Sequence, residues 1–188
     1  MLISILIFLV LYILDQYLKY YVEHNYIYDS NHTVIPHFLK LSYTENKGMA
    51  WSMLSDNQII LVIISIIGMI VLLFVLYKYG SWKECKFFTF ATTLAFTGCV
   101  ANLFDRGIAV MGIDGAREGV IDMIRLKPFD MVCKFFNLGV TTFNLADLYL
   151  VIGVICMMID ILFLRDKRNE NKGIIKRKKL KRSKVLKD

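Results

Sequence analysis

Four long apolar runs limit what this chain can fold into. Hydrophobic residues make up 56% of its 188 residues, and only two residues are proline. A stretch of about 20 apolar residues is long enough to cross the hydrocarbon core of a bilayer as a helix. The sequence therefore predicts an integral membrane protein, mainly α, with four transmembrane helices. The four runs are Met1–Tyr21, Gln58–Tyr77, Phe87–Phe104 and Phe143–Leu164.

Two of these runs differ from the others. The first has the length of a cleaved signal peptide, but it lacks a basic start and a small-residue cleavage site, and it carries Asp15 and Lys19. We therefore interpret it as a retained helix. The third run is the least apolar because four threonines interrupt it, namely Thr89, Thr92, Thr93 and Thr97.

The distribution of basic residues predicts the orientation in the membrane. The tail 165–188 holds twelve basic and three acidic residues, whereas the loop 23–57 holds two basic and four acidic residues. The positive-inside rule then places both termini in the cytoplasm and the loops 23–57 and 105–142 outside. Beside a final membrane helix, a polybasic tail is expected to contact anionic lipid rather than nucleic acid.

Several acidic residues lie within or beside the apolar runs, where an ionised carboxylate is costly. In the predicted orientation, Asp15, Asp105 and Asp147 all fall towards the outer ends of their helices. Asp122 belongs to the apolar stretch Gly119–Ile124, which is predicted to form a short strand against the membrane face. Every acid that looks misplaced therefore points to the outer interface. The functional interpretation is a site there, and the alternative is that each acid caps a helix or lies at its wet end.

A pair of facing carboxylates can hydrolyse an amide bond. Near a low-dielectric boundary one carboxyl keeps its proton while the other activates water, as in aspartic proteases. No serine or cysteine lies beside a histidine in a nucleophile motif, and the histidines and cysteines lack metal-ligand or disulfide spacing. We therefore expect neither a metal nor a cofactor. Asn144 suits a helix N-cap as well as a substrate contact.

Four short blocks, taken in order, resemble the lipoprotein signal peptidases of bacteria, the signal peptidase II family. All four fall on the predicted outer side of the membrane. The blocks are Asp15-Gln-Tyr-Leu-Lys19, Asn46-Lys-Gly-Met-Ala50, Gly98–Arg106 followed by Val120-Ile-Asp122, and Phe143-Asn-Leu-Ala-Asp147.

The resemblance implies an aspartic endopeptidase that removes the signal peptide from a diacylglyceryl-modified prolipoprotein, on the amino side of the lipidated cysteine. It implies that Asp122 and Asp147 form the catalytic dyad, with Asp105 as the other candidate partner. Arg106 would pair with Asp105 or with substrate backbone. The segments 34–43 and 49–54 would form a small extracytoplasmic β-rich cradle over the site. The residues implied to bind substrate or support the dyad are Asp15, Asn46, Asn102, Asp105, Arg106 and Asn144.

The chain departs from the family pattern at two places. Thr97 and Ala101 stand where glycines are usual, and the stretch between Asp122 and Asp147 is longer than usual, which leaves the shape of the lid over the site open. We expect one membrane domain, residues 1–164, followed by a basic cytoplasmic tail, residues 165–188. The predicted protein is a monomer of the bacterial cytoplasmic membrane whose partners are the prolipoprotein and membrane lipids.

Two other classes of protein compete with this interpretation. A small proton- or cation-coupled transporter subunit would also carry acids within the membrane, but such acids usually lie at the midplane and the two halves usually resemble each other. A scaffold anchored by four helices gives no reason for acids and asparagines to converge at one face. Both alternatives fit the sequence less well than a peptidase.

Overall fold

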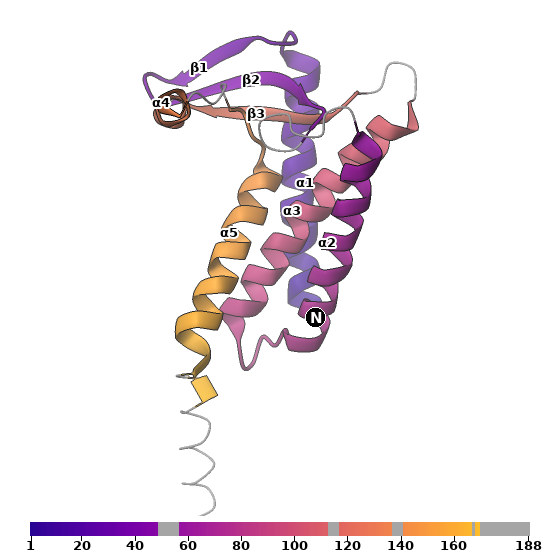
Figure 1. Cartoon of the computed structure of the whole chain (residues 1–188), viewed down its shortest axis with the longest axis vertical. Coiled ribbons are helices and arrows are strands. Elements are labelled where there is room, and N and C mark those ends of the chain that lie inside the picture. Colours follow the sequence, from indigo (N-terminus) through magenta and orange to yellow (C-terminus); the bar gives the residue numbers. More distant parts are fainter. Residues whose placement is uncertain (49–56, 113–116, 137–140, 167, 170–188) are drawn as a thin grey trace, which may run out of the picture.

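The computed structural model describes residues 1–48, 57–112, 117–136, 141–166 and 168–169. Four helices are long and apolar enough to cross a membrane, and they form one bundle (Figure 1). This confirms the predicted fold class. The helices are α1 (Leu2–Asn25), α2 (Gln58–Tyr79), α3 (Lys86–Met111) and α5 (Leu145–Ile159), and α5 continues through a π-helical turn, η2 (Asp160–Leu164).

The helix α3 is the central and most buried member of the bundle. In the 18-residue stretch of α3 that could span the membrane, 67% of the residues are buried, compared with 17% or less in the corresponding stretches of the other three helices. Its threonine hydroxyls donate hydrogen bonds of 2.8 Å to the carbonyl four residues earlier, as Thr93 does to Thr89 and Thr97 does to Thr93. Because these hydroxyls are satisfied within the helix, the least apolar run can occupy the protein interior.

Small residues allow α3 and α5 to pack closely. A side chain at Gly98 would meet the backbone oxygen of Ala146 at 2.2 Å, and one at Gly153 would meet the backbone nitrogen of Ala95 at 2.5 Å. Such close backbone approach is typical of packing between membrane helices. It brings the C-terminal half of α3 against the first turn of α5.

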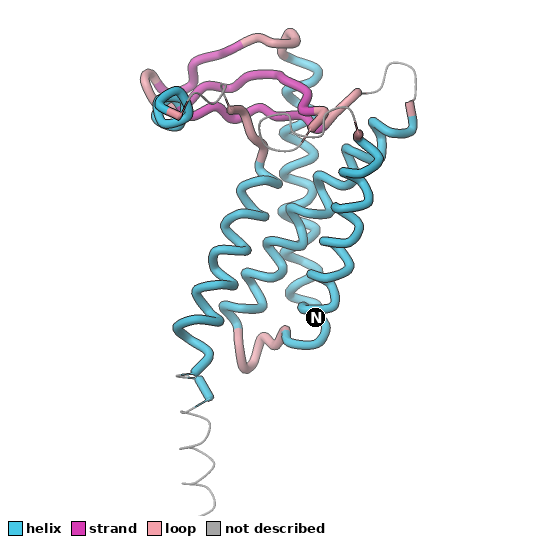
Figure 2. Tube along the Cα trace, viewed as in Figure 1, coloured by secondary structure: helices cyan, strands magenta, loops and turns pink. Residues whose placement is uncertain are grey.

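A three-stranded antiparallel sheet lies across one end of the bundle, and the N-terminus lies at the opposite end (Figures 1 and 2). Its strands, in spatial order, are β1 (Asn31–Ile35), β2 (Leu39–Asn46) and β3 (Val120–Leu126). The cluster of Val22, Ile121 and Met123 is buried between α1 and the sheet. The predicted cradle and the predicted strand around Asp122 are both present. The segment 49–54, also assigned to the cradle, lies outside the described residues.

A short helix, α4 (Lys127–Phe135), follows β3 directly. It is seen end-on in Figure 1 beside the sheet, so its axis runs crosswise to the membrane helices. This helix occupies the lengthened stretch between Asp122 and Asp147, where the sequence analysis placed only a loop.

Candidate active site

Asp122 lies on β3, and its buried side chain accepts a hydrogen bond on each carboxyl oxygen. Asn46 of the neighbouring strand donates to Oδ2 at 3.0 Å, and Asn144 donates to Oδ1 at 2.7 Å. The register explains the first contact: Thr44 lies opposite Asp122, so Asn46 is its diagonal neighbour on the same face. Burial, and then the nearby charge of Asp147, raise the pKa of Asp122 to about 8, against the opposing effect of the hydrogen bonds from Asn46 and Asn144.

Asn144 joins this strand to α5. The preceding residue, Phe143, pairs with Ile124 of β3 through backbone hydrogen bonds of 2.7 and 3.0 Å, which brings Asn144 beside Asp122. The side-chain oxygen of Asn144 then accepts from the backbone N–H of Asp147 at 2.9 Å, while the Asp147 carboxylate accepts from the backbone N–H of Asn144 at 3.2 Å. This reciprocal capping box starts α5. Asn144 is therefore both a helix cap and a contact of the Asp122 carboxylate.

Asp147 is held from the other side by α3. The side-chain amide of Asn102 donates to Asp147 Oδ1 at 2.7 Å. The amide oxygen of Asn102 accepts from the ammonium of Lys19 at 3.3 Å, which fixes which end of the amide faces Asp147. Asp147 keeps part of its surface exposed, whereas Asp122 and Asn144 are buried. The two carboxylates thus share a hydrogen-bonded frame built from a strand and two helices.

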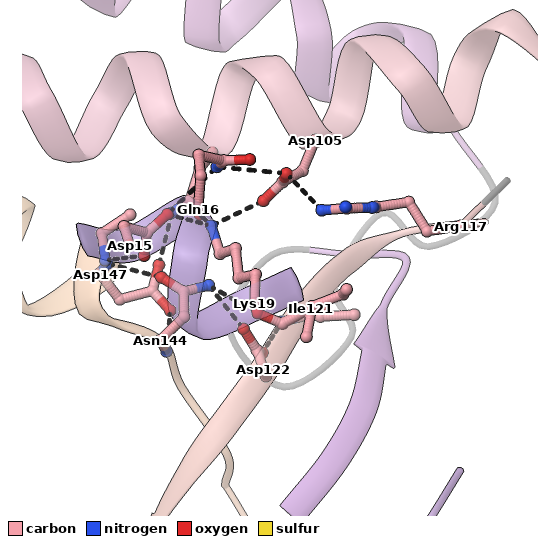
Figure 3. Close-up of polar contacts among 12 residues, drawn as sticks. Asp15, Gln16, Lys19, Asp105, Arg117, Ile121, Asp122, Asn144 and Asp147 are labelled. Carbon is pink, nitrogen blue, oxygen red and sulfur yellow. Dashed lines mark hydrogen bonds and ion pairs between the residues drawn. The ribbon is translucent and has the colours of Figure 1, made fainter. Parts of the chain in front are cut away.

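Next to this frame, Lys19 of α1 is fully buried between two acids (Figure 3). Its ammonium lies 2.7 Å from Asp15 and 2.6 Å from Asp105. Asp15 also accepts from the backbone N–H of Ala146 at 2.9 Å, in the first turn of α5, where a helix favours a negative charge. Asp105 is further paired with Arg117 at 2.8 Å. The network therefore ties α1, α3 and the start of α5 together.

Arg106 does not pair with Asp105 among the described residues, so of its two expected partners only the substrate backbone stays a prediction. The two side chains leave α3 in different directions: Asp105 points to Lys19, and Arg106 reaches the hydroxyl of Ser65 at 3.2 Å and the carbonyl of Gly48 at 3.4 Å. The Nε–H of Arg106 is buried and has no hydrogen-bond partner among the described residues. An unsatisfied buried donor of this kind is suited to a substrate carbonyl.

A cavity of about 490 Å³ opens beside Asp147. Its polar lining residues include Asn46, Arg106 and Asp147. Its volume is in the usual range for sites that bind small molecules or short peptide segments. The lining supplies the carboxyl of Asp147, the guanidinium of Arg106 and the amide of Asn46, and the carboxyl of Asp122 lies one hydrogen bond behind Asn46. Together these groups provide an acid, a base and donors for a polarised carbonyl. No cluster of three metal-ligating side chains occurs in the described part of the chain.

The predicted site residues all converge, but the sequence analysis missed their supports. Lys19 and Gln16 belong to a quoted block, and the i, i+4 spacing of Asp15 and Lys19 was the signal that could have found the buried ion pair. No motif or helical spacing in the sequence identified Arg117 as a partner of Asp105. The expectation that every misplaced acid points outward was also wrong: Asp160 is buried at the opposite end of the bundle, where Arg168 binds both of its oxygens at 2.9 Å.

A bundle of four apolar helices that holds two linked carboxylates at one end defines a membrane protein equipped for acid–base chemistry. The model of the signal peptidase (SPase) II family matches residues 7–163. The chain belongs to the signal peptidase II family, as the four sequence blocks predicted. It is thereby a member of a family of aspartic endopeptidases, and the transporter alternative finds no support.

Similar proteins cover nearly the whole chain. A lipoprotein signal peptidase of Latilactobacillus sakei is 37% identical over 86% of this chain and 95% of its own length. One from Staphylococcus aureus is 32% identical over 92% of this chain and 94% of its own length. A bacterial membrane enzyme solved by the in meso method at 2.3 Å resolution has a TM-score of 0.68 and 33% identity, over 88% of this chain and 90% of that one.

Proposed function

We propose that this protein removes signal peptides from diacylglyceryl-modified prolipoproteins, cutting on the amino side of the lipidated cysteine. Family membership supports the reaction, and the similar proteins are lipoprotein signal peptidases. The observation that carries the assignment of the site is the link made by Asn144, which bonds Asp122 through its amide and caps the helix of Asp147. Asp122 and Asp147 are thus the dyad.

The environments of the two acids divide their roles. Because the pKa of Asp122 is raised to about 8, this buried carboxyl holds a proton at neutral pH. Asp147, which is partly exposed and faces the cavity, is the base. Asp147 takes a proton from water as the water oxygen bonds to the scissile carbonyl carbon, and Asp122 gives its proton to the carbonyl oxygen. The C–N bond then breaks: the amine receives the proton from Asp147, and a hydroxyl of the intermediate returns one to Asp122.

Asp105 fits a supporting role better than a place in the dyad. One of its oxygens lies 2.6 Å from Lys19 and the other lies 2.8 Å from Arg117, so both face cations rather than the cavity. Asp15 also has a supporting role, because it accepts a hydrogen bond from the backbone of Ala146 in the first turn of α5. Asn102 supports Asp147 by donating a hydrogen bond to its carboxylate. Asn46 orients Asp122, and the free Nε–H of Arg106 is available to a substrate backbone carbonyl.

The positive-inside rule supports an orientation with both termini in the cytoplasm. The sheet and the dyad lie at the end of the bundle opposite the N-terminus, which in that orientation is the outer face (Figure 1). Residues 1–164 are then the peptidase domain and residues 165–188 a cytoplasmic tail. We propose that the chain acts as a monomer because its dyad is built within one chain.

The direct test is cleavage by the purified protein in detergent. The substrate is a prolipoprotein that carries the diacylglyceryl group on its cysteine, and the control is the same precursor without that group. The modified precursor should be shortened, and the product should begin at the lipidated cysteine. A folded preparation that leaves the modified precursor intact, or that cuts at another bond, would contradict the proposed function.

A further inference from the structure

The helix α2 is the most apolar of the four membrane helices, and only 6% of its membrane-spanning stretch is buried. From Ile59 to Leu76, Ser65 is its only polar side chain. A hydroxyl in an apolar environment costs free energy unless it is hydrogen-bonded, and polar side chains within membrane helices are often functional. Ser65 is therefore the position of α2 at which a polar partner is required.

Ser65 lies on the side of α2 that packs against α3. Leu61, one turn earlier, is buried, and a side chain at Gly68, one turn later, would meet the sulfur of Cys99 on α3 at 3.5 Å. The three positions are four and three residues apart, so they share one face of α2. The sulfur of Cys99 also donates to the backbone oxygen of Ser65 at 3.4 Å. The hydroxyl of Ser65 is thus close to α3.

The Ser65 hydroxyl joins the backbone of α2 to the guanidinium of Arg106. It donates to the carbonyl of Leu61 at 2.8 Å and accepts from Nη1 of Arg106 at 3.2 Å. A hydroxyl has one proton to donate and two lone pairs. Because its proton is used within α2, its lone pairs are left for a donor, and the guanidinium supplies one. Nη2 of Arg106 donates to the carbonyl of Gly48 at 3.4 Å, so both terminal nitrogens are anchored.

This anchoring leaves one edge of Arg106 for the substrate. Its Nε–H has no partner among the described residues, and the side chain lines the cavity beside Asp147. An arginine side chain has many rotamers, and ordering it on binding costs free energy. Because Ser65 already restrains the guanidinium, part of that cost is met before the substrate arrives.

We propose that Ser65 is a positioning residue for substrate binding, whose hydroxyl holds Arg106 so that its Nε–H meets a backbone carbonyl of the substrate. The proposal rests on the proposed function. The scissile carbonyl receives its proton from Asp122, so the carbonyl that meets Arg106 is a different one. Ser65 itself does not line the cavity, so its effect passes through Arg106.

The kinetic parameter that should change is KM. A carbonyl away from the scissile bond accepts the same hydrogen bond in the bound substrate and in the transition state. Loss of such uniform binding raises KM and leaves kcat little changed. A loosened Arg106 must instead be ordered by the substrate, and ordering one long side chain corresponds to roughly a 2- to 10-fold loss of affinity.

The first experiment compares Ser65→Val with Ser65→Thr in the full-length protein, with the diacylglyceryl-modified precursor in detergent. Valine and threonine have similar shapes, but only threonine keeps the hydroxyl. Ser65 is partly exposed, so the added methyl groups can be accommodated at the surface. Ser65→Val should raise KM roughly 2- to 10-fold with kcat little changed, and Ser65→Thr should keep the wild-type KM.

Two controls test whether the effect passes through Arg106. Cys99→Ala alters the same contact between α2 and α3 but leaves the Ser65 hydroxyl in place, so it should keep the wild-type KM. In an Arg106→Gln background, Ser65→Val should cause no further change, because two residues that act through one contact are not additive. Thermal midpoints are measured in parallel, and Ser65→Ala, which also lacks the hydroxyl, replaces Ser65→Val if the valine variant does not fold.

The outcomes separate this proposal from the proposed function. If the wild type cleaves the modified precursor but Ser65→Val and Ser65→Thr have equal KM values, the positioning role is wrong and the function stands. A rise in KM that is as large in Cys99→Ala, or that persists in the Arg106→Gln background, would also overturn it, because the hydroxyl would not then act on Arg106. If the wild type leaves the modified precursor intact, the proposed function itself fails.

Discussion

The side-chain amide of Asn144 donates a hydrogen bond of 2.7 Å to the carboxylate of Asp122. The same side chain caps α5 through the backbone N–H of Asp147 at 2.9 Å. One residue thus serves two structural purposes: it starts a membrane helix and it sets the position of one acid relative to the other. The two purposes can be separated by mutation.

Replacing Asn144 with serine keeps a cap but is expected to lose the contact with Asp122. Asn144→Ser and Asn144→Ala both lose the buried hydrogen bonds that the amide donates to Asp122 and to the carbonyl of Ile121, so both should be less stable than the wild type. Serine is a good N-cap, so Asn144→Ser should be more stable than Asn144→Ala by about 1 kcal/mol. Both variants should lower kcat, because neither side chain holds Asp122. Thermal midpoints and cleavage rates measured together test this. Full activity in Asn144→Ser would show that the asparagine matters only as a cap.

Removal of the Lys19 ammonium should destabilise the fold strongly. It would leave Asp15 and Asp105 as buried acids without their shared cation, a change that typically costs about 3–5 kcal/mol. Lys19→Met retains much of the side-chain volume and should therefore lower the thermal midpoint in detergent. The matched control is Lys47→Met, which breaks the exposed pair with Glu118 and should change the midpoint little. Equal midpoints for the two variants would contradict the assignment.

The raised pKa of Asp122 predicts how activity and stability change with pH. Cleavage needs this carboxyl protonated, so kcat/KM should fall above about pH 8. Between about pH 4, where a carboxyl in an unfolded chain loses its proton, and about pH 8, the folded state binds more protons at this site than the unfolded state. This site's contribution to stability therefore declines as pH rises through that window. Asp122→Asn should remove this part of the slope, and an unchanged slope would argue against a raised pKa.

Membrane topology can be tested with reporters at two positions. A reporter fused after Asp188 should be active only in its cytoplasmic form, and one inserted near His32 only in its external form. The second position precedes β2 in the first long loop. The reverse pattern would place the dyad on the cytoplasmic side and would remove the basis for the proposed orientation.

The spans and the strand around Asp122 followed from sequence because both patterns are local, whereas the hairpin of β1 and β2 has its turn inside the segment 34–43 that was predicted as one alternating stretch. A run of apolar residues identifies a membrane helix whatever its neighbours are, and alternation identifies a strand such as β2. The helix α4 could not be found this way. It is nine residues long, with a proline at its second position, and helices of that length depend on tertiary contacts such as the Arg125–Asp130 pair.

The site residues were predictable as a group but their pairings were not. Each of Asp15, Asn102, Asp122 and Asp147 could be assigned to one end of the bundle by its position in a helix or strand. Asp105 and Arg106 are adjacent on α3, so their side chains point about 100° apart around the helix axis. Which of the two faces Lys19 depends on how α1 is rotated against α3, and the sequence does not contain that information. Asp160 was missed because its partner, Arg168, lies two turns later in a segment interpreted only as a basic tail.

The claim that Asp122 and Asp147 act as one dyad is tested most directly by Asp→Asn variants in the cleavage assay. Asp122→Asn and Asp147→Asn should each abolish cleavage of the lipid-modified precursor while leaving a folded, membrane-inserted protein. The double variant should be no worse than either single one, because residues that act as a unit are not additive. Asp105→Asn should instead lower the thermal midpoint. If Asp122→Asn keeps substantial activity while a well-folded Asp105→Asn has none, the partner of Asp147 is Asp105, and if both dyad variants still cleave, the account is contradicted.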